Sequence, residues 1–455
     1  MHLRDLEDDK KMMVVQFLLQ HSKDGIPKYG KMKEAGIKFN LGRRTVTRLW
    51  AEAKKQKDQG QLINLTSKKR FTPRLRKRVQ IDIAQIQALE LCRRGTIRKL
   101  AVGIQVSKST VGRWVHLGLI RAHTNAIKPD LTAPNKLLRL RFSLEALEYD
   151  RIANILKFKT MHNVVHVDEK WFYMTKANNR YYLTKEEPEP YRSCKSKKFI
   201  TKVMFLCAVC RPLFDENGNV LFDGKIGIFP FTQVIPAQRR SKNRNAGTPE
   251  TKPIQSITQA VMRECFINQL IPAIMNKWPQ GASKLIFIQQ DNAKPHISDS
   301  DIEFRQAASQ NGLDIRLVQQ PPNSPDTNVN DLGWFRAIQS IQEESVCTTV
   351  DQLVNAVCKS FMDLSPIALN KVFLSLQGCM IETMKMKGHN AYKLPHMGKD
   401  ALIRQNALPL TLEVDKDLVD QCIMHMIESG EAESMQDLSL QLGFGNEAHH
   451  TTIQA

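Results

Sequence analysis

The spacing of the apolar residues changes near residue 160 of this 455-residue chain. Before that point, apolar side chains recur three and four residues apart, as they do along one face of an α-helix. Beyond it, runs rich in β-branched and aromatic residues alternate with helical stretches, as in "NVVHVDEKWFY" (163–173), "TKVMFLCAVC" (201–210) and "KLIFIQQD" (284–291). Strands that alternate with helices indicate an α/β sheet. We therefore expect an all-α N-terminal region followed by an α/β domain.

The helical region contains two similar units, residues 1–62 and 79–122. Each ends in a helix with apolar residues at positions i, i+3 and i+4, after a short helix and a turn. These residues are Val46, Leu49 and Trp50 in the first unit, and Val111, Trp114 and Val115 in the second. A tight turn followed by a helix with cationic residues near its start is typical of a helix-turn-helix. Two ordinary helical bundles without a role in DNA binding are the alternative.

Polar and cationic side chains of these units are expected to contact DNA. They are Arg43, Arg44, Thr47 and Arg48 in the first unit, and Lys108, Ser109 and Arg113 in the second. The linker between the units, residues 63–78, adds seven cations: Lys68, Lys69, Arg70, Arg74, Arg76, Lys77 and Arg78. Such a linker can follow phosphates or enter a minor groove, and it can serve as a nuclear import signal. A solvated run of charge is the alternative reading.

The charge of the chain is strongly uneven. The net charge is +20, from 66 Lys and Arg against 46 Asp and Glu. Residues 1–150 carry +18, residues 151–400 carry +9, and residues 401–455 carry −7. A basic module of this kind points to a nucleic acid as partner. No membrane association is expected, because the longest apolar runs are about eight residues, against the roughly 20 that a spanning helix needs.

Composition divides the remaining chain into a connector (123–160), an α/β domain with an inserted loop (161–400) and an acidic tail (401–455). The connector is predicted to begin extended and to continue as a helix over about 135–157. Further strands are predicted at 180–184, 224–231 and 314–320, and helices at about 74–93, 255–277 and 298–312. From Asp331 onward the pattern is helical. The tail carries no recognisable motif.

Three carboxylates stand where chemistry is expected. Asp168 follows the apolar run 164–167, Asp291 ends the run 285–290, and Asp331 opens a helix after a proline-rich turn. Open α/β sheets place ligand-binding residues at the carboxyl ends of strands, so acids far apart in the sequence can converge there. Three converging carboxylates suit two Mg²⁺ ions, with Mn²⁺ as a substitute, and such ions support phosphoryl transfer. Acids that merely cap turns are the alternative.

The residues around the three acids carry a family resemblance. The blocks "HVDEKWFYM" (166–174), "QQDNAKPH" (289–296) and "QPPNSPDTNVNDLGWFRAIQ" (320–339) occur in this order, after two helix-turn-helix units. Together they resemble the mariner-like DNA transposases, whose catalytic core is RNase H-like. An aspartate as third acid, separated from Asp291 by 39 residues, and the wording "DLGWFRAIQS" look most like the branch common in plants. The linker lacks the glycine-arginine-proline hook of many relatives, which puts hook-like reading of the minor groove in doubt.

The resemblance implies roles for individual residues. Asp168, Asp291 and Asp331 match the catalytic metal ligands. Asn292 and His296 match the motif that follows the second acid, where they would orient that ligand or a nearby phosphate. We expect Asp326 to be structural. Glu169 should point away from Asp168, because neighbours on a strand face opposite sides.

Two further sets of residues near the strands are expected to be structural. His166 shares a strand face with Asp168 and is predicted to pack near the site. Cys207 and Cys210 lie in an apolar strand without a second pair of ligands, and core packing is favoured over zinc binding for both.

The resemblance also implies an activity. The protein would bind the terminal inverted repeats of its own element as a homodimer, cut the DNA ends, and join the 3′-hydroxyls to TA target sites in the nucleus. The basic loop at 195–202 would contact the partner subunit. A domesticated or inactive copy acting as a sequence-specific DNA-binding regulator is the main alternative. A nuclease or integrase without element ends is a third.

Overall fold

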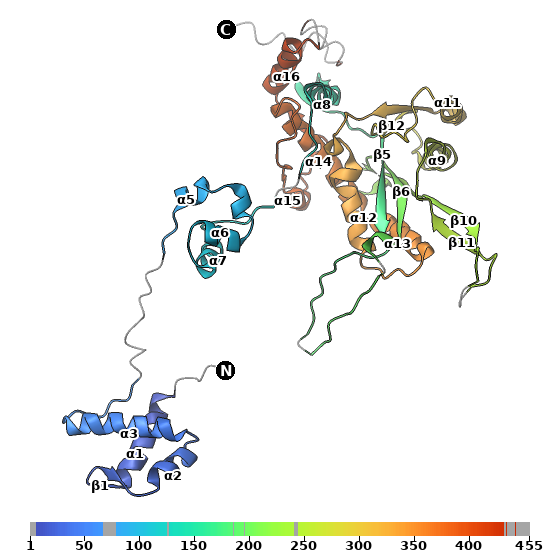
Figure 1. The fold of residues 1–455 in the computed structure, drawn as a ribbon. Helices are drawn as coiled ribbons and strands as arrows, with labels where there is room; N and C mark the ends of the chain where they lie inside the picture. Colours follow the sequence, from blue (N-terminus) through green and yellow to red (C-terminus); the bar gives the residue numbers. More distant parts are fainter. Residues whose placement is uncertain are drawn as a thin grey trace, which may run out of the picture. The chain divides into compact units, whose positions relative to one another are not determined.

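The structure is a computed structural model that describes residues 6–66, 79–124, 127–184, 186–194, 196–240 and 244–431, with residues 434 and 442 and, at 311, only the backbone. The chain divides into two compact units, Met1–Asn125 and Ala126–Ala455 (Figure 1). The first unit is helical apart from one small hairpin, and the second is built on a mixed sheet. This agrees with the expected order of an α-helical N-terminal region and an α/β domain.

The first helical bundle consists of α1 (Asp8–Gln20), α2 (Lys31–Lys38) and α3 (Arg43–Asp58). Val46, Leu49 and Trp50 are buried against α1, as the spacing predicted. A short hairpin of β1 (Ser22–Lys23) and β2 (Ile26–Pro27) separates α1 from α2 and was not predicted.

The second bundle consists of α5 (Ile83–Ala88), the 3₁₀ helix η1 (Leu91–Arg94), α6 (Ile97–Gly103) and α7 (Lys108–His116). Ser107 caps α7, because its hydroxyl accepts a hydrogen bond from the Thr110 amide at 3.1 Å. Val111 and Trp114 are buried, whereas Val115 is 36% exposed and does not belong to the core. The helix predicted over 74–93 is, within its described part, the short α5 followed by η1.

The second unit is organised by a five-stranded sheet (Figure 1). Its strands are β5 (Val164–Tyr173), β6 (Lys202–Val209), β9 (Lys225–Pro230), β12 (Leu285–Gln290) and β13 (Asp314–Gln319). Their order is β13-β12-β5-β6-β9, with β5, β12 and β13 parallel and β6 antiparallel to both of its neighbours. All five strands lie where the apolar runs predicted them.

Helices cover both faces of the sheet. One face packs against α9 (Gln259–Cys265), the π-helical turn η3 (Phe266–Leu270), α10 (Ile271–Lys277) and α11 (Ile302–Ala308). The other packs against α8 (Ala133–Glu145), α12 (Phe335–Gln342), α13 (Val350–Asp363), α14 (Pro366–Lys385) and α16 (Lys416–Glu428). Along β5, Val165 and Val167 face the first layer and Phe172 the second, as the two-residue period of a strand requires.

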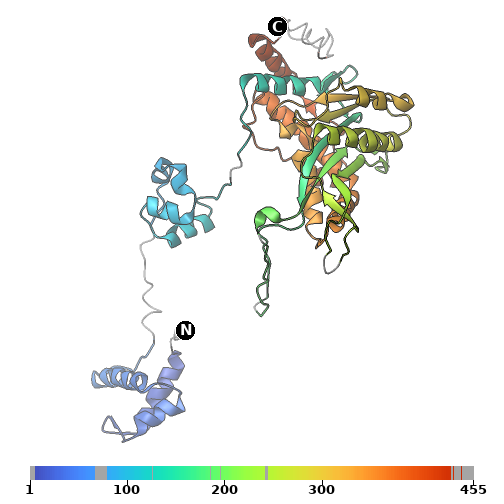
Figure 2. The same cartoon turned by 45° about the vertical axis from the view of Figure 1, so that its right-hand side comes forward.

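Smaller elements complete the unit. They are η2 (Lys197–Phe199), the hairpins β7 (Leu213–Phe214) with β8 (Val220–Phe222) and β10 (Thr232–Pro236) with β11 (Pro249–Pro253), η4 (Gln310–Gly312), η5 (Pro325–Thr327), η6 (Asn330–Trp334) and α15 (Lys399–Arg404). Residues 174–201 form a long excursion between β5 and β6 (Figure 2). The strand predicted at 180–184 is absent from the described part of this excursion.

The connector and the tail contribute to this unit in ways that their sequences did not indicate. The helix predicted over 135–157 ends at Glu145 and is followed by a hairpin of β3 (Leu147–Asp150) and β4 (Ile155–Phe158). Strand β14 (Glu413–Val414), from the tail, pairs with β4. The helix predicted over 298–312 is shorter than expected, because α11 ends at Ala308.

No single helix in the described part of the chain is both long and apolar enough to cross a membrane. The pair α13–α14 meets these criteria only when its two helices are taken together, and it bends by 78° at the break. Leu353, Val357 and Phe373 of this pair lie in the core beside the sheet.

Candidate active site

The register of the parallel strands brings Asp168 and Asp291 to the same level of the sheet. Gln289 of β12 pairs with His166 of β5, and each aspartate follows two residues later. The two strands stop pairing at this point, while β5 continues along β6 with Asp168 opposite Cys207. The sequence predicted both acids at the carboxyl ends of strands. Asp291 does follow the end of β12, but Asp168 lies in the middle of β5, because that strand continues along β6 to Tyr173.

Buried amides fix the turn that presents Asp331. The side-chain amide of Asn328 donates to the main-chain oxygen of Val167 at 2.9 Å, and that of Asn330 donates to the oxygen of His166 at 3.1 Å. Gln289 donates to the oxygen of Thr327 at 2.9 Å. These bonds tie the turn directly to β5 and β12. They were not singled out from the sequence, although three polar amides beside apolar strand ends were a readable signal.

The carboxyl groups of Asp168 and Asp331 lie close enough together for their charges to interact. Burial raises the pKa of Asp168 well above its usual range, and the nearby charges of Asp331 and Glu169 add to that rise. Burial also raises the pKa of Asp331, with further contributions from Asp291 and Glu169, while Lys170 opposes it. Carboxyl groups this close cannot both ionise without a compensating cation.

His296 connects Asp291 to a further carboxylate, that of Glu169. Its Nδ1 lies 2.9 Å from both Oδ1 and the main-chain oxygen of Asp291, and its Nε2 lies 3.0 Å from Oε2 of Glu169. Burial lowers the pKa of His296, but its hydrogen bonds to Asp291 and Glu169 outweigh this and raise the pKa to about 10. The hydrogen bond from His296 in turn lowers the pKa of Asp291. The imidazolium therefore holds Asp291 in its ionised form.

Glu169 points to the opposite sheet face from Asp168, as expected for neighbours on a strand. Its carboxylate nevertheless reaches the site through His296, a link that the sequence reading did not anticipate. Asn292 acts on the loop rather than on a carboxylate, because its amide donates to the main-chain oxygen of Gln320 at 2.8 Å. His296 thus orients Asp291 directly, and Asn292 joins the ends of β12 and β13.

The expected structural role of Asp326 is confirmed. Both of its carboxylate oxygens accept hydrogen bonds from the buried guanidinium of Arg139, at 2.6 and 2.7 Å, and Tyr392 is a further partner. Arg139 also donates to the main-chain oxygen of Gly388 at 2.9 Å. Asp326 therefore anchors the turn before Asp331 to α8.

His166 and the two cysteines are packing residues, as predicted. The His166 ring is 1% exposed and lies edge-on to Phe373, with ring centroids 5.3 Å apart. Burial lowers its pKa to about 3, so it is neutral. Cys207 and Cys210 are free and buried on opposite faces of the sheet, and the thiol of Cys210 donates to the main-chain oxygen of His162.

Within the described residues, no group of three or more His, Cys, Asp or Glu side chains is arranged to hold a metal ion. The donor chemistry nevertheless fits a hard divalent cation. Asp168 and Asp331 are two neighbouring oxygen donors whose mutual repulsion a cation would relieve, and Asp291 is held ionised near them.

Some of the residues expected to contact DNA lie in the described part of the chain, and others do not. Arg43, Arg44, Thr47 and Arg48 are exposed on the first half of α3, Lys108 and Ser109 are exposed at the start of α7, and Arg113 is half-buried. The linker residues Lys68, Lys69, Arg70, Arg74, Arg76, Lys77 and Arg78 lie outside the described part of the chain.

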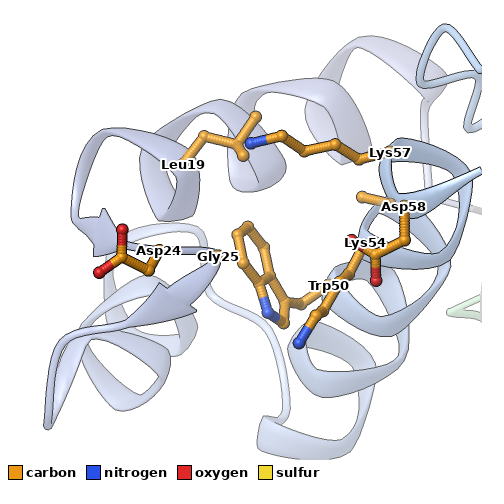
Figure 3. A pocket seen from close by; sticks show the side chains of 8 residues that line it. Leu19, Asp24, Gly25, Trp50, Lys54, Lys57 and Asp58 are labelled. Carbon is orange, nitrogen blue, oxygen red and sulfur yellow. The ribbon is translucent and has the colours of Figure 1, made fainter. Parts of the chain in front are cut away.

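A cavity of about 280 Å³ opens in the first bundle, away from those α3 residues (Figure 3). It is lined by the Trp50 ring, by Leu19 and the Asp24–Gly25 turn, and by Lys54 and Lys57 of the second half of α3. The indole partly closes the gap between the turn and α3. This cavity belongs to the packing of the bundle and contains none of the three acids.

No family model and no curated protein matches the chain. Solved structures with some similarity to the chain do exist. A pre-cleavage Mos1 transpososome is 14% identical with a TM-score of 0.47, over 86% of this chain and 100% of that one. The mariner Mos1 paired-end complex with Mg is 15% identical with a TM-score of 0.46, over 85% and 99%. The catalytic domain of Mos1 mariner transposase is 14% identical with a TM-score of 0.36, over 59% and 100%.

Proposed function

We propose that this chain is a DNA transposase of the mariner-like kind, from the plant-type branch with an Asp-Asp-Asp triad on an RNase H-like core. It would bind the terminal inverted repeats of its element, cut the DNA ends, and join the 3′-hydroxyls to TA target DNA. One observation carries this proposal. Asp168 and Asp331, far apart in the sequence, bring their carboxyl groups close together at the level of the sheet where Asp291 emerges.

The three aspartates would hold two Mg²⁺ ions, with Mn²⁺ as a substitute. Such ions supply an activated water and offset the charge that develops on the phosphate. The chain's own residues do the rest. Asp168 and Asp331 present paired oxygens from a rigid strand and turn, and His296 keeps Asp291 ionised and oriented. Lys170, whose charge reaches Asp331, adds positive potential for an approaching phosphodiester.

The N-terminal unit would select the DNA ends. Arg43, Arg44 and Arg48 are exposed at the N-terminal end of α3. In helix-turn-helix proteins, the same end of the recognition helix enters the major groove. The basic residues would contribute affinity through phosphates, and the groove contacts would contribute sequence choice. A homodimer in the nucleus, with the basic loop at 195–202 contacting the partner subunit, completes the proposal.

The test is strand cleavage by the full-length protein on DNA that carries the element's own ends, in Mg²⁺ or Mn²⁺ buffer. Asp291→Ala should abolish nicking at the terminus while end binding in a mobility-shift assay stays unchanged. Asp363→Asn is the matched control, because Asp363 is exposed on α13 and its only partner here is Lys359. Cleavage by Asp291→Ala at the wild-type rate would refute the triad. End binding without cleavage by the wild type in either metal would favour the DNA-binding regulator.

A further inference from the structure

A second cavity lies beside the candidate active site. It has a volume of about 530 Å³ and lies between α14 and the segment 394–404, which includes α15. A smaller cavity of about 240 Å³ is lined by Asp331 itself, together with Lys128 and Tyr392. The two cavities share Leu332 and Leu394 as lining residues. The two cavities therefore adjoin at these two side chains.

Four basic side chains line the larger cavity, among mostly apolar residues. They are Lys371, His396, Lys399 and Arg404, with Asp400 as the one acid in the lining. Asp400 is already engaged, since it forms an ion pair with Lys371, and Arg404 donates to its main-chain oxygen at 3.2 Å. The remaining potential of the cavity is positive, next to a site rich in acids.

Lys399 is the most informative of these residues. It is half-buried, and its ammonium donates to the hydroxyl of Ser375, a neutral acceptor. Among the described residues no carboxylate forms an ion pair with it. Burial lowers its pKa, which shows that its surroundings do not compensate the charge fully. A half-buried cation with only a hydroxyl partner is suited to an anionic ligand.

We propose that this cavity binds backbone phosphates of the DNA strand that continues from Asp331, with Lys399 as the principal contact. The inference rests on the proposed function, which places a phosphodiester at Asp331. The size of the cavity supports a strand rather than a single small anion, because it falls within the range of about 300–1,000 Å³ that accommodates whole organic ligands. Leu332 and Leu394 line both cavities, so the strand would pass these two side chains on its way from Asp331 to Lys399.

Lysine footprinting tests the contact one residue at a time. The full-length protein is acetylated in Ca²⁺ buffer, alone or with a duplex that ends in a single-stranded tail, and the modified lysines are measured by mass spectrometry. DNA should slow the acetylation of Lys399 several-fold. It should leave Lys359 unchanged, because that side chain is 76% exposed on α13 and does not line either cavity. Inorganic phosphate in place of DNA is the second arm.

A variant tests the energetic contribution. Lys399→Gln should lower the slope of log affinity against log salt by about 0.7–0.9, the loss of one phosphate contact, whereas Lys399→Arg should keep it. Lys359→Gln should also keep the slope. Thermal melting establishes that each variant is folded. If Lys399→Gln proves unstable, the footprint of Lys399 in the wild-type protein still tests the contact.

Several outcomes would overturn the inference. Lys399 could remain fully reactive on DNA while lysines of the N-terminal unit become protected, or inorganic phosphate could protect it as well as DNA does. The second result would indicate a small-anion site. The proposed transposase activity is tested by a separate measurement, DNA cleavage. Footprinting in Ca²⁺ does not depend on catalysis, so the two proposals can be rejected independently. Protection of Lys399 without cleavage would keep the DNA contact and reject the activity.

Discussion

His296 fixes the orientation of the Asp291 carboxylate. Its two ring nitrogens are both occupied, one by Asp291 and the other by Glu169. Because Asp291 follows directly after β12, in a loop with few other contacts to its carboxylate, this bridge and the Ala293 amide fix its orientation. Partners that orient a metal ligand in this way contribute strongly to metal affinity.

Replacing His296 or its partner should therefore weaken metal use. We expect His296→Ala to raise the Mn²⁺ concentration needed for half-maximal cleavage by about 10–100-fold, and Glu169→Gln to raise it less. Mn²⁺-dependent thermal stabilisation should fall in parallel, which a purely structural defect would not produce. Asn292→Ala is the comparison, because its amide bonds to Gln320 and not to a carboxylate. Equal Mn²⁺ dependence for His296→Ala and the wild type would contradict this role.

Asp326 shows how a residue near the site acts through stability. Burial raises the pKa of Asp326, but the hydrogen bonds from Arg139 outweigh it and hold that pKa below its usual value. With the folded pKa depressed, the ion pair stabilises the protein above the unfolded pKa of 3.8. That contribution is lost as the pH falls through the folded value, because the unfolded state takes up its proton first.

Asp326→Asn should destabilise the second unit by about 3 kcal/mol at neutral pH, since it leaves the buried Arg139 without its counter-charge. Part of the acid-induced loss of stability below about pH 4 should disappear in the variant. Urea unfolding across pH measures both effects. Asp314→Asn is the matched control, because its pair with Arg316 is exposed and should contribute little to stability. A smaller effect of Asp326→Asn than of Asp314→Asn would refute the anchoring role.

At the level of elements, the sequence predicted those strands that are apolar on both faces. Runs such as 285–290 and 202–209 must be buried in any fold, so composition alone identifies them. The aromatic run at 180–184 has the same local signal but no pairing partner in the described structure, where Tyr182 is 92% exposed. Strand formation depends on a neighbour, and that information is not local.

The residues of the candidate site also divide into those that the sequence predicts and those that it does not. The three acids were predictable, because apolar runs precede Asp168 and Asp291 and a motif surrounds Asp331. The turn amides and the Glu169–His296 bridge were not, since they depend on which loops meet. The hairpin of β3 and β4 was missed for a similar reason. Its pairing with β14 joins residues such as Leu156 and Val414 that are distant in sequence.

Helix α16, in the acidic tail, is expected to stabilise the second unit although it carries no motif. Ile423 is fully buried in the core shared with α8 and α14, whereas its neighbour Met424 is 47% exposed. Ile423→Ala should lower the free energy of unfolding by about 2–5 kcal/mol, and Met424→Ala by less than about 0.5 kcal/mol. Chemical denaturation of the full-length chain gives both values. Equal effects would mean that α16 does not pack as the structure shows.

For the whole molecule, the separation of charge matches the separation of tasks. The excess of +18 within residues 1–150 is carried largely by the helical unit and its linker, whereas the sheet unit gathers acids at its strand ends. A single basic surface at the three acids would weaken any hold they have on cations. Placing the two functions in separate compact units avoids that conflict.

This division predicts where the salt dependence of end binding originates. In the full-length protein, the triple change Arg43→Gln, Arg44→Gln and Arg48→Gln should reduce the slope of log affinity against log salt by up to about 2.7, or about 0.9 per phosphate contact. The matched control changes Lys54, Lys55 and Lys57 to Gln, which removes the same charge from the other end of α3, where the chain is also exposed. Because only the start of α3 is expected to meet DNA, the control should change the slope far less.

Fluorescence anisotropy over a salt series measures the slope for both triple variants. Equal slopes for the two triple variants would show that the charge of α3 acts as a whole, and would reject the helix-turn-helix assignment of its first half.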